Sequence, residues 1–257
     1  MLRTLVRVQH GAVGRLTLDS PGNRNALSLD MLRELQAGLR ALTGAGSRCI
    51  VLDHTGPAFS SGHDLKQLQA GAKDRAASEE VFRVCSEVMM EVAESPAPVI
   101  AQVDGVATAA GAQLVASADL AYASEGSRFA TPGVNIGLFC STPAVPIARV
   151  VAPKHAMHML LTGDLIDAAT AERYALINQA LPQGELAGAV AATAGAIASK
   201  PAAVIRAGKT ALRRQLQTPT LAEAYEVASS AMVANLEVDD CKEGLAAFFG
   251  KRKPNFN

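Results

Sequence analysis

The sequence predicts an α/β fold in which a largely parallel sheet is followed by a helical C-terminal region. Short apolar runs that are typical of buried strands alternate with segments of helical periodicity over the first part of the chain. Stretches rich in glycine, proline or serine separate these runs. Beyond Pro153 only helical patterns are evident. Strands that alternate with helices indicate parallel pairing through right-handed crossovers.

The first predicted elements are a strand at Val13–Leu18 and a turn at residues 19–23. Ser28 is a favourable N-cap for the helix that follows, because its hydroxyl can accept a hydrogen bond from a backbone N–H of the first turn. Apolar residues recur through this helix at helical spacing: Met31, Leu32, Leu35, Leu39 and Leu42. Gly44-Ala45-Gly46 ends it, and a continuous apolar strand is predicted at residues 49–53.

The same order then repeats. A helix is predicted at residues 79–94, and Ser95-Pro96-Ala97-Pro98 breaks it. A strand at Val99–Val103, a helix from about Ala109 and a strand at residues 120–123 follow. This pattern indicates successive strand–helix units of one sheet.

The C-terminal part is predicted to be helical. Asp167 caps a helix over residues 168–175, Pro201 precedes Ala202–Gln215, Thr220 opens a helix to Asn235, and Asp240 precedes a last helix to Phe249. We expect an α/β core over residues 1–197 and a helical region over residues 198–257.

Charge and cysteine content exclude several classes of function. The 24 Lys and Arg residues balance the 24 Asp and Glu residues, so no net charge favours nucleic acid or an anionic membrane. The four cysteines lack the spacing of a metal site, and we expect reduced thiols and no metal. With no signal peptide or membrane-spanning run evident, a cytoplasmic location is expected. The mitochondrial matrix stays possible if a transit peptide was removed.

Two turns built of small residues are the most informative local feature. Ser60-Ser61-Gly62-His63-Asp64-Leu65 and Gly105-Val106-Ala107-Thr108-Ala109-Ala110-Gly111 each follow an apolar strand and precede a helical segment. Backbone N–H groups at a helix start have no partner within the helix and are electropositive. Two such turns directed at one point would form an oxyanion hole. Small residues also allow close packing of a helix on a sheet, which is the alternative explanation.

The sequence resembles the crotonase, or enoyl-CoA hydratase/isomerase, family from about Val6 to Phe256. The matching stretches include Asn23-Arg24-Asn25-Ala26-Leu27, Ala58 to Lys66, Val99 to Gly105, and the tail from Glu243-Gly244 to Phe256. Thr131-Pro132-Gly133 and Phe139-Cys140-Ser141-Thr142-Pro143 are similar to the domain-containing-3 branch. The resemblance implies a core built as a spiral of ββα turns, with helical tails that pack on neighbouring subunits of a homotrimer or hexamer.

By resemblance, the backbone amides of His63 and Ala110 are the oxyanion donors. The two positions at which hydratases of the family carry catalytic glutamates are Gln113 and Gly133. A carboxamide such as Gln113 can hold a water or a thioester but has no proton to exchange, and glycine has no side chain. The His63 imidazole could titrate near neutrality and act as a base, or it could take no part. Asp64 is expected to bond nearby backbone amides, Asp119 to be structural, and Cys140 to be an inert packing residue.

The resemblance also implies that coenzyme A is bound as part of an acyl-CoA substrate, with no covalently bound cofactor. The expected contacts combine a cation for phosphate, the backbone of the first small-residue turn and two tail residues, one reaching the adenine and one the 3′-phosphate across a subunit boundary. These residues are Arg24, Ala26, Gly62, Asp64, Leu65, Lys66, Phe248 and Lys251.

The expected function is therefore that of an acyl-CoA-binding enzyme that polarises a thioester carbonyl, with weak or no conventional hydratase activity. Three alternatives stay open. One is an acyl-CoA decarboxylase of the methylmalonyl-CoA type, which needs an oxyanion hole and little proton transfer. Another is a non-catalytic acyl-CoA-binding protein. The third is a hydratase or isomerase with an unrecognised base such as His63.

Overall fold

Two sheets form the core of the computed structural model, which describes residues 4–71 and 74–256. Residues 1–3, on which part of the signal-peptide expectation depends, lie outside the described residues. The larger sheet, within the described chain, has the order β1 (Val6–Gln9), β2 (Val13–Leu18), β3 (Cys49–His54), β5 (Val99–Val103), β7 (Leu120–Ser124) and β10 (Gln179–Leu181). The smaller has the order β4 (Ala58–Ser60), β6 (Val106–Thr108), β8 (Arg128–Ala130) and β9 (Ile166–Asp167). Neighbouring strands are parallel except β1 with β2 and β8 with β9.

From β3 to β8, consecutive strands of the chain alternate between the two sheets. Strands β3, β5 and β7 belong to the large sheet, and each is followed by a short strand of the small sheet, β4, β6 or β8. Helical segments come next: α2 (Leu65–Gly71) and α3 (Arg75–Glu94) after β4, α4 (Ala110–Ser117) after β6, and η2 (Pro132–Ile136) with α5 (Ser141–Val150) after β8. This order confirms the spiral of ββα turns. The short second strands were not predicted, because three residues are too few to show a period.

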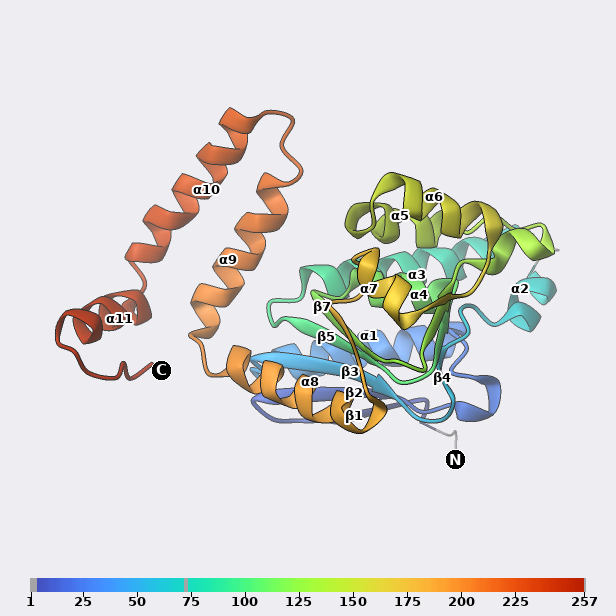
Figure 1. Cartoon of the computed structure of the whole chain (residues 1–257), viewed down its shortest axis with the longest axis horizontal. Coiled ribbons are helices and arrows are strands. Elements are labelled where there is room, and N and C mark those ends of the chain that lie inside the picture. Colours follow the sequence, from blue (N-terminus) through green and yellow to red (C-terminus); the bar gives the residue numbers. More distant parts are fainter. Residues whose placement is uncertain (1–3, 72–73, 257) are drawn as a thin grey trace.

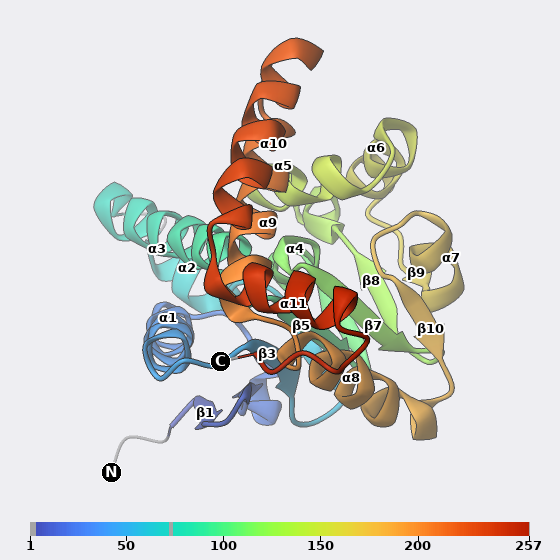
Figure 2. The ribbon, with the colours of Figure 1, turned by 90° about the vertical axis from the view of Figure 1, so that its left-hand side faces the viewer.

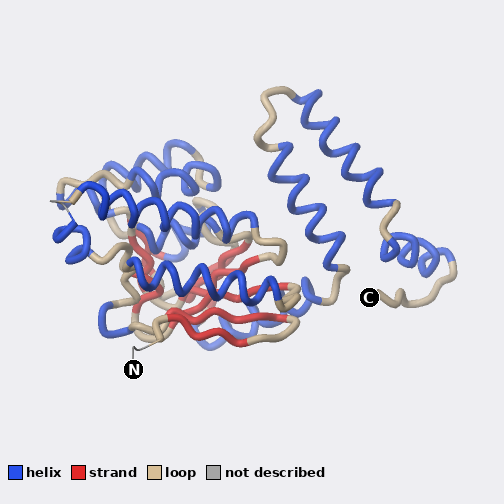
Figure 3. Tube along the Cα trace, turned by 180° about the vertical axis from the view of Figure 1, so that it is seen from behind, coloured by secondary structure: helices blue, strands red, loops and turns tan. Residues whose placement is uncertain are grey.

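Helices cover both faces of the large sheet. Alternate residues of β2 are buried on the side of α1 (Leu29–Gly44), where Leu16 and Leu18 join the main core with Leu32 and Leu35. On the other side α8 (Gln183–Ala198) packs Val190 and Ala194 on Val51 and Ile100. Figure 3 shows the strands gathered at one end of the molecule, away from the paired helices of the C-terminal region. The predicted Ser28 cap is confirmed, since its Oγ accepts a hydrogen bond from the Met31 amide.

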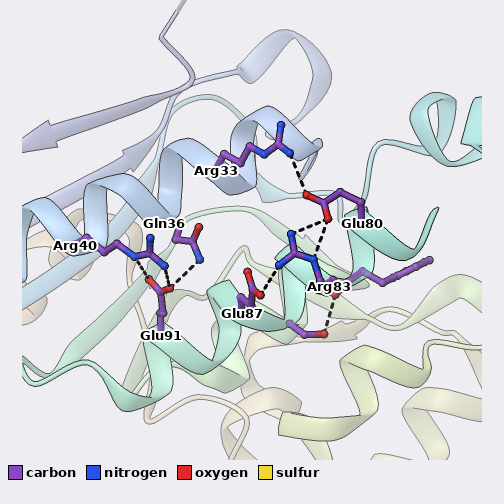
Figure 4. A network of polar contacts seen from close by, with 9 residues as sticks. Arg33, Gln36, Arg40, Glu80, Arg83, Glu87 and Glu91 are labelled. Carbon is purple, nitrogen blue, oxygen red and sulfur yellow. Dashed lines mark hydrogen bonds and ion pairs between the residues drawn. The ribbon is translucent and has the colours of Figure 1, made fainter. Parts of the chain in front are cut away.

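An ion-pair network joins the exposed sides of α1 and α3 (Figure 4). Arg33 contacts Glu80 at 3.1 Å, Glu80 also pairs with Arg83, and Arg40 pairs with Glu91, which accepts a further bond from Gln36. Each exposed pair contributes little by itself, on the order of 0.2–1 kcal/mol. Together they hold α3, which carries Phe82 toward the turn after β4.

The helical C-terminal region is confirmed, with two corrections to the elements after Pro153. Strands β9 and β10 lie in this part of the chain, between α6 (Pro153–Thr162), α7 (Ala168–Arg173) and α8. Both strands are too short to show an alternating pattern in the sequence. Each adds to the edge of a sheet, where backbone N–H and C=O groups would otherwise be unpaired. Helix α11 (Asp239–Phe249) has Val238 as its N-cap, so Asp240 lies inside the helix. The caps Asp167 and Thr220 are confirmed by bonds to the amides of Thr170 and Glu223.

Helices α9 (Ala202–Gln215), α10 (Leu221–Leu236) and α11 project from one end of the α/β core (Figure 1), and Figure 2 looks onto that end. The axes of α8 and α9 differ by 102°. No single described helix has the length and hydropathy to cross a membrane, and α8 with α9 passes that test only as a bent pair. Asp119 anchors α9 to the core by ion pairs with Lys209 at 2.6 Å and Arg213 at 3.1 Å. It also accepts a bond from the Val99 amide, which confirms its structural role.

Candidate active site

The two small-residue turns lie against each other. Strands β4 and β6 are parallel neighbours, so the turns that follow them share one edge of the small sheet. Gly62 has φ +88°, and a Cβ there would lie 3.1 Å from the Ala110 nitrogen and 2.8 Å from the Ala109 Cβ. A Cβ at Gly111 would lie 2.3 Å from the Ser60 carbonyl oxygen. Glycine at both positions is therefore what allows the turns to touch.

The backbone N–H groups of His63 and Ala110 are available at this contact. Among the described residues, neither group donates a hydrogen bond to the rest of the chain. Ala110 is the first residue of α4, where an amide has no acceptor within the helix. The neighbouring amides of Lys66 and Gln67 are bonded to Asp64 Oδ1 at 2.9 and 3.3 Å. Asp64 thus binds nearby backbone amides, as expected.

Ala109 holds the second turn in a strained conformation. Its φ of 49° and ψ of −117° lie in a region that favours glycine. Its amide is fixed by a 2.9 Å hydrogen bond to the Ala130 carbonyl, on the neighbouring strand. The sequence pattern did not reveal this strain, because alanine at a helix start is unremarkable in a pattern of small residues.

The Arg24 loop is tied to the first turn through the backbone. The Leu27 amide bonds the Gly62 carbonyl at 2.7 Å, and the Ser61 amide bonds the Arg24 carbonyl at 3.0 Å. Asn25 is fully buried, and its side chain accepts from Ser20 N and donates to the carbonyls of Thr55 and Ala58. This places exposed Arg24 and buried Ala26 beside Gly62. Sequence reasoning overlooked Asn25, although the left-handed φ of 51° that it adopts is one that asparagine tolerates.

The His63 imidazole lies against α3. Its ring packs edge-on against Phe82, with centroids 5.2 Å apart, and Nε2 is buried without a hydrogen-bond partner. Burial lowers the pKa of His63 to about 4. Of the two alternatives for this imidazole, the lowered pKa favours the one in which the side chain takes no part as a base, because no neighbouring charge in the described chain compensates for the lost hydration of the cation.

Gln113 lies one turn into α4 and is 3% exposed. Its Oε1 is buried without a partner, although most buried polar atoms in proteins are hydrogen-bonded. Gly133 lies in η2, and a Cβ there would come within 2.0 Å of the Leu138 carbonyl oxygen and 2.8 Å of Cys140 Sγ. The backbone after Gly137 therefore fills the space that a side chain at position 133 would need.

Comparison with known proteins identifies the family of this chain. The model of the family described as enoyl-CoA hydratase/isomerase matches residues 9–257. The chain belongs to this family. Enoyl-CoA hydratase domain-containing protein 3, mitochondrial, is 47% identical in Rattus norvegicus over 252 residues, which cover 98% of this chain and 83% of the relative. The Homo sapiens protein of that name is 47% identical over 249 residues, 96% of this chain and 81% of the relative. The predicted resemblance is thereby confirmed.

Solved structures of the enoyl-CoA hydratase/isomerase family agree in fold. Human enoyl coenzyme A hydratase domain-containing protein 3 superposes with a TM-score of 0.95 at 44% identity, covering 98% of this chain and all of that chain. An enoyl-CoA hydratase from Mycobacterium smegmatis gives a TM-score of 0.95 at 39% identity, with 99% of each chain covered. That Gln113 and Gly133 stand at the positions of the two hydratase glutamates stays a prediction.

The other expected contact residues fall into two groups within one chain. Arg24, Ala26, Gly62 and the segment from Asp64 to Lys66 gather at the first turn and the start of α2. Phe248 and Lys251 lie at the end of α11, and Figure 1 shows α2 and α11 at opposite ends of the molecule. Cys140 is 7% exposed, and burial raises the pKa of its thiol, which suits a packing residue. Within the described chain, no group of three or more His, Cys, Asp or Glu side chains is placed to hold a metal ion.

Proposed function

We propose that this member of the enoyl-CoA hydratase/isomerase family binds an acyl-CoA thioester and polarises its carbonyl between the N–H groups of His63 and Ala110. The observation that supports this is the close approach of the two turns, in which a Cβ added at Gly62 would lie 3.1 Å from the Ala110 nitrogen, together with the absence of an acceptor for the His63 and Ala110 amides among the described residues. An enolate oxygen placed between such donors would be stabilised, and losing one of them costs about 2.7–4 kcal/mol of activation free energy.

Conventional hydration is proposed to be weak or absent. Adding water to an enoyl thioester requires a base that activates the water and an acid that protonates the α-carbon. Neither Gln113 nor Gly133 can exchange a proton, and a neutral His63 directed at Phe82 is a weak base. General acid–base catalysis contributes about 10²–10⁴-fold, so its loss would leave little hydratase activity.

Decarboxylation is the second candidate, because it needs the amide pair and little else. In a malonyl-type thioester the bond from the α-carbon to the carboxylate would break, and CO₂ would leave. The electron pair of the broken bond would pass into the thioester and form an enolate, whose oxygen the two amides would hold. The α-carbon would then take a proton from water. A non-catalytic acyl-CoA-binding role is the third candidate.

One experiment separates these candidates. The purified protein is incubated with crotonyl-, malonyl- and methylmalonyl-CoA, binding is followed by calorimetry, and products are identified by mass spectrometry. Loss of CO₂ supports decarboxylation, and rapid formation of a 3-hydroxyacyl product contradicts the proposed weak hydration. Binding without turnover supports the non-catalytic role. If no thioester binds at millimolar concentration, every candidate is wrong.

We also propose a homotrimer or hexamer, assembled through the region after residue 197. Large apolar side chains of the three last helices are exposed in the single chain, at levels that mark interaction surfaces. They include Leu216, Leu221, Tyr225, Met232, Leu236, Phe248 and Phe249. In such an assembly Phe248 and Lys251 of one subunit would approach the nucleotide bound to Arg24 of another. The mitochondrial names of the rat, mouse and human relatives favour the matrix over the cytoplasm.

A further inference from the structure

Lys251 lies in a turn that is fixed by hydrogen bonds of the residues on either side of it. It follows the end of α11 with φ +51°, a left-handed conformation that helix ends usually reserve for glycine. The Gly250 amide bonds the Ala246 carbonyl at 2.9 Å, and the Arg252 amide bonds the Ala247 carbonyl at 3.0 Å. The neighbouring glycine, Gly250, has an ordinary φ of −78°. The unusual backbone conformation therefore falls on the lysine, where it needs support from the surrounding structure.

Glu243 provides that support from the first half of α11. Its two carboxylate oxygens accept hydrogen bonds from Arg252 Nη1 and Nη2 at 2.5 and 2.7 Å, which is the strong bidentate arrangement. Oε1 also accepts a 2.8 Å hydrogen bond from the Asn255 amide. The Phe256 ring covers the adjacent Gly244, where an added Cβ would lie 3.6 Å from the ring. One carboxylate thus folds residues 252–256 back on the helix.

The electrostatics of the tail agree with this geometry. The bonds from Arg252 and the Asn255 amide lower the pKa of Glu243 to about 2, so the pair is ionised at neutral pH. Of the basic cluster Lys251-Arg252-Lys253, Arg252 is neutralised by Glu243. Lys251 and Lys253, on either side of Arg252, are both exposed, and of the two it is Lys251 that lies in the turn held by the flanking hydrogen bonds.

We infer that Glu243 is a positioning residue, which presents Lys251 in a preformed turn to the 3′-phosphate of the coenzyme A. This inference rests on the proposed function, because it takes Lys251 as a phosphate contact. Preorganisation acts by removing the cost of ordering the turn when the ligand binds. The effect of Glu243 should consequently appear only when both Lys251 and the 3′-phosphate are present.

The test is a cycle of variants read by calorimetry with coenzyme A and with 3′-dephospho-coenzyme A. Glu243→Gln should weaken coenzyme A binding by about 2- to 12-fold, the equivalent of ordering one long side chain. It should leave binding of the dephospho form unchanged, and it should have no further effect in a Lys251→Ala background. Arg252→Lys keeps the positive charge but loses the two parallel hydrogen bonds to Glu243, so it should behave like Glu243→Gln. Glu237→Gln, at the end of α10, is the matched control and should change neither affinity.

The outcomes are distinguishable. Equal weakening of both ligands, or a Glu243→Gln effect that persists without Lys251, would overturn the inference and leave the proposed thioester binding intact. Equal affinity of the native protein for both ligands would overturn it together with the role of Lys251. Failure of the native protein to bind any coenzyme A thioester would instead contradict the proposed function itself. Light scattering on each variant establishes that subunit assembly is unchanged.

Discussion

Gly62 and Ala110 meet so closely that a single methyl group at position 62 would lie 3.1 Å from the Ala110 nitrogen. Residues 48 positions apart in the chain are brought together because β4 and β6 are parallel neighbours. This contact brings together the two turns that carry the His63 and Ala110 amides, which the proposed chemistry requires to be close.

Gly62→Ala should therefore destabilise the protein and abolish thioester binding. The new Cβ would require a positive φ and would also crowd Ala109 and Ala110. We expect a loss of roughly 1–3 kcal/mol in the free energy of unfolding, measured by urea denaturation. Gly46→Ala is the matched control, since Gly46 has φ +80° with no atom within 4 Å of its added Cβ. Equal losses in both variants would show that the contact contributes nothing.

Ala109→Gly should stabilise the protein. Removing the Cβ relieves a strain of about 1–3 kcal/mol, whereas the added freedom of glycine in the unfolded chain costs about 0.5–1 kcal/mol. A net gain of about 1 kcal/mol in the free energy of unfolding is expected from urea denaturation. Ala175→Gly, at an ordinary left-handed φ of 62°, should gain less. A loss of stability in Ala109→Gly would contradict the strain assigned to this residue.

Gln113→Glu should raise hydration of crotonyl-CoA from a level about 10²–10⁴-fold below that of a two-glutamate hydratase. The new carboxyl group would be nearly fully buried, so the variant should be less stable at neutral than at mildly acidic pH. Product formation is followed by mass spectrometry, with the free energy of unfolding measured in parallel. Robust hydration by the native protein would show that the acid–base groups have been misplaced.

Gly133→Glu is expected to fail as a companion to that change. The obstacle is not a positive φ, which Gly133 lacks, but the Leu138 carbonyl oxygen 2.0 Å from the added Cβ. A side chain here must displace residues 137–140, so this substitution should reduce stability without adding hydration. Folded, active Gly133→Glu protein would show that the loop moves more freely than the packing implies.

Stability should fall as the pH is lowered from about 6.5 to about 4. Burial lowers the pKa of His63 to about 4, so the unfolded chain takes up a proton in this window while the folded protein does not. The contribution of His63 is on the order of 3 kcal/mol, fully present above pH 6.5 and lost at about pH 4. Half-buried His54, whose pKa is also lowered by the loss of hydration, acts in the same direction.

His63→Phe keeps an aromatic ring against Phe82 and removes the titration, so denaturation of this variant should depend less on pH over the same window. His54 stays in both proteins and is the internal control. An identical pH dependence of native protein and variant would contradict the buried, neutral state of His63. Thioester binding should survive in His63→Phe, because the proposed donor is the backbone amide.

The assembly prediction concerns the exposed apolar face of the last helices. Light scattering should give a mass of about 80 or 160 kDa, three or six times the 26.6 kDa of one chain. Leu236→Asp, on α10, should dissociate the assembly, because Leu236 is 53% exposed in the single chain. Met90→Asp changes an equally exposed residue of α3 and should leave the mass unchanged. A native monomer at micromolar concentration would refute the proposed assembly.

The sequence by itself determined the α/β class, the helices capped by Ser28, Asp167 and Thr220, the membership of the family and the two small-residue turns. These features depend on local periodicity, on capping chemistry and on motifs that are continuous in the chain. The division of the chain after residue 197 stays a prediction.

Only the tertiary structure decided how those pieces act on one another. The contact of Gly62 with Ala110, the burial that holds His63 neutral against Phe82 and the backbone that fills the space beside Gly133 all join residues distant in sequence or separated by turns. The strain at Ala109 and the Glu243–Arg252 pair likewise depend on φ and on side-chain direction. Periodicity carries no information about either quantity, because it records which residues are apolar and not where folding places them.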